Sequence, residues 1–190
     1  MDTPPLSLMR THLRAFPLVL FLAVALIGCG GSDSSPDVAA TSSSPSTTQS
    51  ESSADVDRTV TLHPKGNQMK YRETEFTVAP GETIRLVFEN TATSPSMQHN
   101  VVVLASTEEG IFQKVGEAGT RAGSTNDYIP QEESLREQIL AYTPMSKPGE
   151  TVEVTFTVPE ETGEYGYVCT FPGHWATMQG TMYVREDGAA

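Results

Sequence analysis

The chain has 190 residues, and its 24 acidic and 12 basic side chains give a formal net charge of −12 at pH 7. Such an acidic chain repels phosphate backbones and anionic bilayers, which excludes nucleic-acid binding and favours cationic partners. The chain contains two cysteines, Cys29 and Cys169. If either of them is modified or binds a metal, an intrachain disulfide is excluded as well.

Residues 1–28 have the composition of an export leader. Arg10 and Arg14 give a basic start, and the apolar run that follows is shorter than the roughly 20 residues of a permanent membrane helix. The leader ends in Leu26-Ile27-Gly28-Cys29, which resembles the bacterial lipobox. This resemblance implies cleavage before Cys29 and acylation of that cysteine; an uncleaved membrane anchor is the alternative.

Residues 29–58 are predicted to form a disordered tether. Serine, threonine, aspartate, proline and alanine dominate this stretch, which has too few large apolar residues to bury a core. A flexible coil of this length would span roughly 30 Å root-mean-square. With lipid on Cys29, the tether would hold a folded domain at a bacterial membrane, in the periplasm or on the extracytoplasmic face.

From residue 59 onward the sequence changes to short apolar or alternating runs separated by glycine and proline turns. In the run 83–89, for example, Ile84, Leu86 and Phe88 share one face. The expected strands are 59–62, 75–78, 83–89, 99–104, 151–158, 165–169 and 181–184. This pattern predicts an all-β sandwich of about seven or eight strands in a domain that spans residues 59–186.

Residues 105–147 interrupt the strand pattern. Residues 107–122 could form a helix that is capped by Thr107, with Glu108 and Glu109 in its first turn. Residues 134–141 fit a helix or a strand when considered alone.

The candidate site lies in the stretch from Cys169 to Met178. A thiol, an imidazole and a thioether, from Cys169, His174 and Met178, fall within ten residues, and a Pro-Gly turn separates the first two. One thiolate, two imidazoles and a long thioether bond suit copper, whereas the thioether and the lone cysteine disfavour a structural zinc site. The second imidazole must come from elsewhere, and His99, at the start of an apolar run, is the candidate.

The ligand stretch resembles that of the azurins, the bacterial blue copper proteins, and the related membrane-tethered auracyanins. The spacing Cys-x4-His-x3-Met and the wording Cys-Thr-Phe-Pro-Gly-His agree, as do Asn67-Gln68-Met69, His99-Asn100 and Gly180-Thr181 in the same order. The resemblance covers residues 59–186. It implies a Greek-key β-sandwich, the cupredoxin fold, with a helical flap around 107–122 and a strand near 138–143.

The resemblance also implies a set of roles at one type 1 copper ion. Cys169, His99 and His174 would be the equatorial ligands and Met178 the long axial one, with a contact from the backbone carbonyl of Gln98 where azurins have glycine. Asn100 would tie the strand of His99 to Thr170, and the backbone N–H groups of Asn100 and Phe171 would point at the sulfur. His63 fits no ligand position and is expected to lie exposed at a strand end.

An apolar docking patch is implied around the second histidine, at Met69, Met97, Phe171, Pro172, Gly173 and Ala176. Trp175 is expected on or near this patch and would enlarge it; a partly buried tryptophan is the alternative. The implied function is single-electron transfer by a monomer, with cytochromes, oxidases or reductases as partners. Envelope copper storage or delivery is the alternative. Catalysis is not expected, because no histidines remain for a second metal once His99, His174, His63 and the leader's His12 are set aside.

Overall fold

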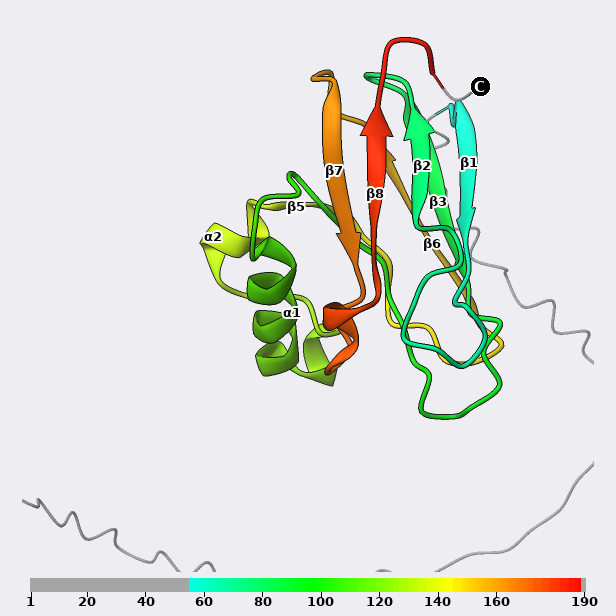
Figure 1. The fold of residues 1–190 in the computed structure, drawn as a ribbon, viewed down its shortest axis with the longest axis vertical. Helices are drawn as coiled ribbons and strands as arrows, with labels where there is room; N and C mark the ends of the chain where they lie inside the picture. The colour runs from blue at the N-terminus through cyan, green and yellow to red at the C-terminus, as the bar shows by residue number, and fades with distance from the viewer. Residues whose placement is uncertain (1–54, 189–190) are drawn as a thin grey trace, which may run out of the picture. The chain divides into compact units, whose positions relative to one another are not determined.

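The computed structural model describes residues 55–188, which form two facing β-sheets with a helical segment on one side (Figure 1). The predicted all-β sandwich is confirmed, with eight strands in the described part of the chain. One sheet has the order β1 (Arg58–Leu62), β3 (Thr83–Glu89), β6 (Thr151–Thr157), and the other has the order β2 (Glu75–Val78), β8 (Gln179–Val184), β7 (Gly163–Val168), β4 (Val102–Leu104), β5 (Ile139–Tyr142). The predicted leader and all but the last four residues of the predicted tether lie outside the described residues.

The alternation in β3 and β6 faces the second sheet as expected. Ile84, Leu86 and Phe88 are completely buried, and they lie opposite three apolar residues of the antiparallel strand β6. Those β6 residues, Val152, Val154 and Phe156, are only partly buried because β6 is an edge strand. The strand therefore points its apolar side inward but has a neighbour on one side only.

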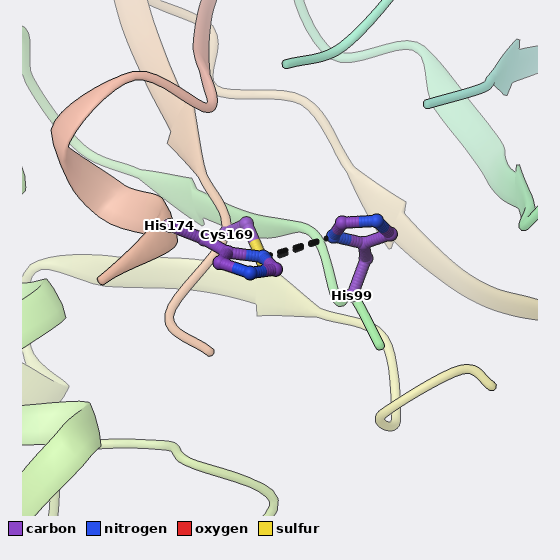
Figure 2. Close-up of side chains that lie close together, drawn as sticks. All are labelled: His99, Cys169 and His174. Atoms are coloured by element: carbon purple, nitrogen blue, oxygen red, sulfur yellow. Dashed lines mark hydrogen bonds between the residues drawn. The ribbon is translucent and has the colours of Figure 1, made fainter. Parts of the chain in front are cut away.

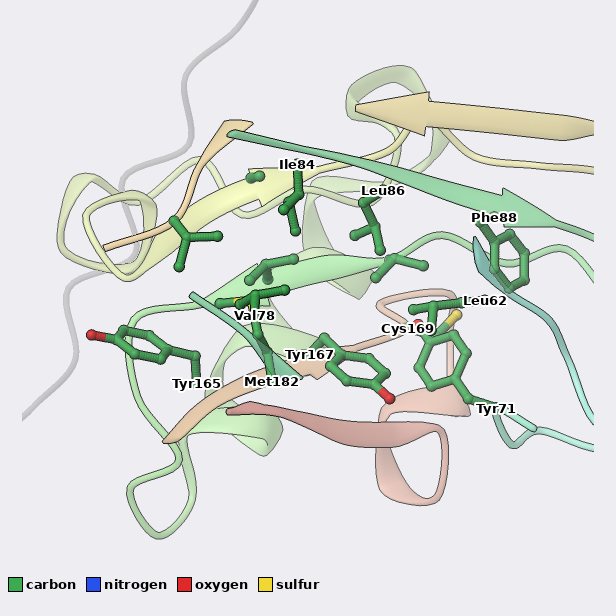
Figure 3. Packing of buried hydrophobic residues seen from close by; sticks show 14 of the residues in the cluster. Leu62, Tyr71, Val78, Ile84, Leu86, Phe88, Tyr165, Tyr167, Cys169 and Met182 are labelled. Atoms are coloured by element: carbon green, nitrogen blue, oxygen red, sulfur yellow. The ribbon is translucent and has the colours of Figure 1, made fainter. Parts of the chain in front are cut away.

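Between the sheets lies the main core, in which large aromatic rings reach from the far end of the sandwich to Cys169 (Figure 3). Tyr71 and Tyr167 are buried with their ring centroids 5.2 Å apart. Both hydroxyls are satisfied, since Tyr71 donates to the carbonyl of Asn100 and Tyr167 to that of Glu73, each at 2.7 Å. These bonds allow the tyrosines to fill the core without an unpaired polar atom.

The run 99–104 is apolar on both faces because its two faces meet different neighbours. Val101 and Val103 pack into the main core, whereas Val102 and Leu104 join a second apolar cluster beneath the helix α1 (Ile111–Ala122). The expected strand over 99–104 was too long, because β4 begins at Val102 and His99 makes an isolated bridge with Ser146.

The flap, residues 105–138, contains α1, η1 (Ser124–Asn126) and α2 (Glu133–Arg136). The predicted cap at Thr107 was wrong. Gly110, with a φ of 79°, turns the chain in the left-handed region and α1 starts after it, with no acidic residue in its first turn. Residues 134–141 end α2 and then enter β5, so the strand expected near 138–143 is present. Among residues 55–188, no helix combines the length and the hydropathy needed to cross a bilayer.

Candidate metal centre

The ligand loop is a closed turn between two neighbouring strands. Cys169 follows β7 directly, His174 begins the short helix η2 (His174–Ala176), and Met178 precedes β8. The backbone N–H of Cys169 donates to the carbonyl of Met178 at 3.0 Å, and that of Met178 donates to the carbonyl of His174 at 2.8 Å. Gly173, with a φ of 81°, makes the turn before η2. Backbone hydrogen bonds thus hold the loop at its base and across its middle.

His99 reaches the loop from the segment before β4. Its backbone exchanges two hydrogen bonds with Ser146, at 3.0 and 2.8 Å, which hold it in place. The side chains of His99, Cys169 and His174 point toward one another, as Figure 2 shows. The two Nδ1 atoms are 3.1 Å apart and lie 3.8 and 3.7 Å from the sulfur, and all ligand atoms fall within 4.8 Å of one another. Met178 is completely buried at the end of the same loop.

Burial sets the protonation of these groups. It raises the pKa of the Cys169 thiol to about 12, against the lowering effect of hydrogen bonds from the backbone N–H groups of Asn100 and Phe171. Burial lowers the pKa of His99 to about 4, assisted by the nearby His174, and lowers that of His174 to about 4 as well. At neutral pH both imidazoles are therefore uncharged, with lone pairs available for a metal.

The donor set fits a copper ion. Two neutral imidazole nitrogens and one sulfur converge in a buried site, and the sulfur and the thioether are soft ligands. Nε2 of His99 is buried without a hydrogen-bond partner among residues 55–188, so the hydrogen-bonding contacts of this ring are all on its Nδ1 side. His99, Cys169 and His174 are the residues that would hold the ion. The role of Met178 as a fourth ligand stays a prediction.

Asn100 joins three parts of the site. Its Nδ2 donates to Thr170 Oγ1 at 2.9 Å and to the carbonyl of Asp127 at 3.2 Å, and its Oδ1 accepts the Thr170 N–H at 2.9 Å. The structure thus contains the expected tie between Asn100 and Thr170. One buried side chain links the segment of His99, the ligand loop and the flap.

Replacing Asn100 with alanine should destabilise the domain by about 2–4 kcal/mol, because it leaves buried donors of Thr170 without partners. Urea unfolding of the metal-free domain would measure this loss. Asn67→Ala is the matched control, since Asn67 makes a similar number of hydrogen bonds to Thr93 and Ser94 on the exposed surface. Equal losses for the two variants would contradict a special role for Asn100.

Most of the predicted docking patch lies exposed beside the ligand loop. Met69 is 43 % exposed, Pro172, Gly173 and Ala176 are exposed, and Met97 is half-buried. Thr177 Oγ1 donates to the carbonyl of Met69 at 2.8 Å, which fastens the Met69 loop to the ligand loop. Of the four candidate ligands only His174 has any exposed surface, 4 %, so it is the ligand nearest to solvent.

The main contacts of Trp175, which was expected on or near the patch, are with the flap. It is half-buried against the second apolar cluster, and a Cβ placed on Gly116 of α1 would come within 2.2 Å of its Cγ. Gln179 Nε2 also donates to the Trp175 carbonyl at 2.6 Å. The alternative of a partly buried tryptophan is correct, and Trp175 joins the ligand loop to the flap.

Trp175→Ala should therefore lower the free energy of unfolding by about 2–3 kcal/mol, somewhat less than for a fully buried tryptophan, and leave the copper-dependent visible absorption in place. Denaturant unfolding and the absorption spectrum of the copper-loaded variant would test both parts. Loss of the absorption, or an unchanged stability, would show that the contact with α1 has been misjudged.

Two other expectations are modified by the structure. Gln98 is half-buried, and Asp127 and Tyr128 are the non-glycine residues with positive φ among those described, so Gln98 has an ordinary backbone conformation. Its carbonyl contact with copper stays a prediction. His63 is not an exposed strand end: it is half-buried, with its ring nitrogens 3.1 Å from a Glu73 oxygen and 3.3 Å from a Glu89 oxygen.

Several supports of the site were missed in the sequence. Tyr71 holds the Asn100 carbonyl, and the Tyr128 ring lies 5.3 Å from that of Phe171. Gly119 allows the Tyr128 carbonyl to approach α1, since a Cβ there would lie 2.3 Å from that oxygen. The spacing of Gly116 and Gly119, three residues apart on one helix face, was a usable signal for close packing. Tyr128 had none.

Comparison with known proteins agrees with this geometry. A family model described as copper binding proteins, plastocyanin/azurin family, matches residues 58–185. Auracyanin-A of Chloroflexus aurantiacus is 35% identical over 181 residues, which cover 93% of this chain and 100% of the relative. An azurin of Alcaligenes faecalis is 37% identical over 102 residues, or 53% of this chain and 75% of the azurin.

Solved structures show the same likeness. The structure titled as auracyanin A, a "blue" copper protein from Chloroflexus aurantiacus, has a TM-score of 0.60 and 37% identity, and the match covers 67% of this chain and 98% of that one. A dithionite-reduced auracyanin from Roseiflexus castenholzii has a TM-score of 0.60 and 38% identity, with 67% and 96% covered. With the convergent His99, Cys169 and His174, these matches show that the chain belongs to the plastocyanin/azurin family of copper-binding proteins.

Proposed function

We propose that this protein is a lipid-anchored blue copper protein that carries single electrons between redox proteins outside the cytoplasm. The observation that carries the proposal is the buried trio of His99, Cys169 and His174, whose ligand atoms lie within 4.8 Å of one another. Bound copper would supply a one-electron Cu(I)/Cu(II) couple. The names of the relatives, auracyanin and azurin, support the same role.

The framework around the trio suits electron transfer because it limits rearrangement. His99 is held by two backbone hydrogen bonds to Ser146, and the ligand loop is held by its own backbone bonds and by Asn100. Such second-layer contacts keep ligand side chains in one orientation. With the ligands held in place whatever the charge of the site, little reorganisation would accompany gain or loss of an electron.

The decisive experiment is an absorption spectrum of the copper-loaded protein recorded through a redox titration. We expect one copper per chain, an intense visible band, and reversible loss and return of the band over repeated cycles in the presence of a chelator. Loss of copper to the chelator on reduction would instead support storage or delivery. Absence of the band would refute a thiolate-ligated site.

Docking would take place at the apolar patch beside His174. An exposed apolar surface of this kind suits short-lived complexes with partners such as cytochromes, oxidases or reductases. The protein would act as a monomer. The choice of this surface for docking is supported by the exposed Met69, Pro172 and Gly173, which lie next to His174, the ligand nearest to solvent.

Lipid anchoring is supported by the motif Leu26-Ile27-Gly28-Cys29 at the end of the leader. Expression of the full chain in a bacterial host, followed by mass spectrometry of its N-terminal peptide, would test it. We expect an acylated Cys29 and recovery in the membrane fraction, whereas Cys29→Ser should yield no acylated peptide. A native chain whose leader is retained, or whose Cys29 is unmodified, would refute the anchor.

A further inference from the structure

The charge close to the docking patch differs from that of the whole protein. The chain has a net charge of −12, which by itself would favour a basic partner. The loop that carries Met69, residues 63–74, has three basic side chains, Lys65, Lys70 and Arg72, and one acidic side chain, Glu73. The ligand loop itself, from Cys169 to Met178, has no charged residue apart from its ligands.

The loop geometry places two of these lysines beside the patch. Lys65 and Lys70 are paired across a tight turn at Gly66, with the Lys65 N–H donating to the Lys70 carbonyl at 2.8 Å. Met69 lies next to Lys70, and its carbonyl accepts from Thr177 of the ligand loop. Lys65, Lys70 and Arg72 are all exposed, and within residues 55–188 none of them forms an ion pair.

The carboxylates nearest this end keep their charge, but most of them are held in contacts within the protein. Glu73 and Glu89 hold the ring of His63, and Glu150 accepts the backbone N–H of Lys147 at 2.7 Å. Two further carboxylates are exposed there, that of Asp127 on the flap and that of Glu75 at the start of β2, opposite Thr181 of β8. The opposite end of the sandwich is different, since it carries Glu160, Glu161, Glu164, Glu186 and Asp187 in the turns and strand ends there.

We infer that the docking end selects an acidic redox protein, one whose exposed cofactor edge is bordered by carboxylates that face Lys65, Lys70 and Arg72. At physiological ionic strength charges are screened beyond about 8 Å, so a partner at the patch senses these lysines more than the distant acidic turns. The inference rests on the proposed electron-transfer function and reverses the preference expected from net charge alone.

The test compares two charge reversals that alter the net charge equally. Lys70→Glu changes the docking end. Arg185→Glu changes an exposed residue after β8, and the six residues of that strand place it roughly 20 Å from the ligand loop. The reduced copper protein would be oxidised in stopped-flow experiments by hexacyanoferrate(III), an anion, and by tris(phenanthroline)cobalt(III), a cation, at about 0.1 M ionic strength, where the Debye length is about 10 Å.

We expect Lys70→Glu to slow oxidation by hexacyanoferrate about threefold or more and to speed oxidation by the cobalt complex. Arg185→Glu should change both rates by less than about 1.5-fold, since it lies beyond the screening length. Lys65→Glu should repeat the effect of Lys70→Glu, which guards against a local folding defect in one variant.

Equal effects of Lys70→Glu and Arg185→Glu would overturn the inference, because only net charge would then matter. So would the absence of any effect at both lysines. Both results would leave the electron-transfer function intact, since the wild type would still react. A wild type that reacts with neither oxidant would overturn the proposed function and this inference together.

Discussion

Replacing Cys169 with serine should abolish the intense visible absorption of the copper-loaded protein. The absorption depends on a sulfur ligand, and a serine hydroxyl is a hard oxygen that stays protonated in this buried position. Serine and cysteine are similar in size, so the sandwich should still fold. The measurement is the visible spectrum of the variant after copper addition, with the metal content determined separately.

Met178→Leu is the matched control for this prediction. Met178 is as completely buried as Cys169 and lies in the same loop, but a thioether in the axial position is a weak ligand. The leucine variant should keep the strong absorption and shift its reduction potential. A Cys169→Ser protein that still shows the band would refute the ligand assignment.

The metal-free domain should be most stable between about pH 6.5 and 9 and lose stability on both sides. Burial lowers the pKa of His99 and His174 from 6.5 to about 4. Between pH 6.5 and 4 the unfolded chain therefore binds more protons than the folded one, and stability falls as the pH falls. Each histidine accounts for up to about 3 kcal/mol over this range.

On the alkaline side the buried thiol acts in the opposite direction. Burial raises the pKa of Cys169 from 9.0 to about 12, so above pH 9 the unfolded chain loses a proton that the folded one keeps. Stability then decreases as the pH rises, by about 1.4 kcal/mol for each pH unit at most. Urea unfolding at a series of pH values, with a chelator present, would record both limbs.

Single variants separate the two limbs. His174→Gln removes one titrating imidazole and should reduce the acid-side loss to roughly half. Cys169→Ser should leave the acid limb in place and move the start of the alkaline loss from about pH 9 to about pH 10, where the buried Tyr71 and Tyr167, whose pKa values burial also raises, begin to contribute. An acid limb that is unchanged in His174→Gln would show that other groups, and not the site histidines, cause the loss.

Local sequence was sufficient for features whose parts lie close together in the chain. The alternation of Ile84, Leu86 and Phe88 predicted β3, because side chains on a strand alternate between two faces. Cys169, His174 and Met178 fall within one loop, so their donor chemistry was readable without a fold. His99 lies 70 residues before Cys169, and the apolar run that it opens made it a candidate that the family resemblance supported. The structure then placed its Nδ1 3.8 Å from the sulfur.

Tertiary structure decided the features that depend on what lies opposite a residue. The helix α1 was predicted to start too early, because Gly110 turns the chain before it and hydrophobic periodicity does not indicate such a turn. The partial burial of Trp175 depends on the surface of α1 at Gly116, in a segment about sixty residues away. The charge near the docking patch also depends on the fold. Composition gives the sum of all charges, whereas a partner in a salt solution is affected mainly by the charges within about one Debye length of it. Composition and local spacing thus determined the class of fold and the chemistry of the donors, and packing decided which surface each residue faces.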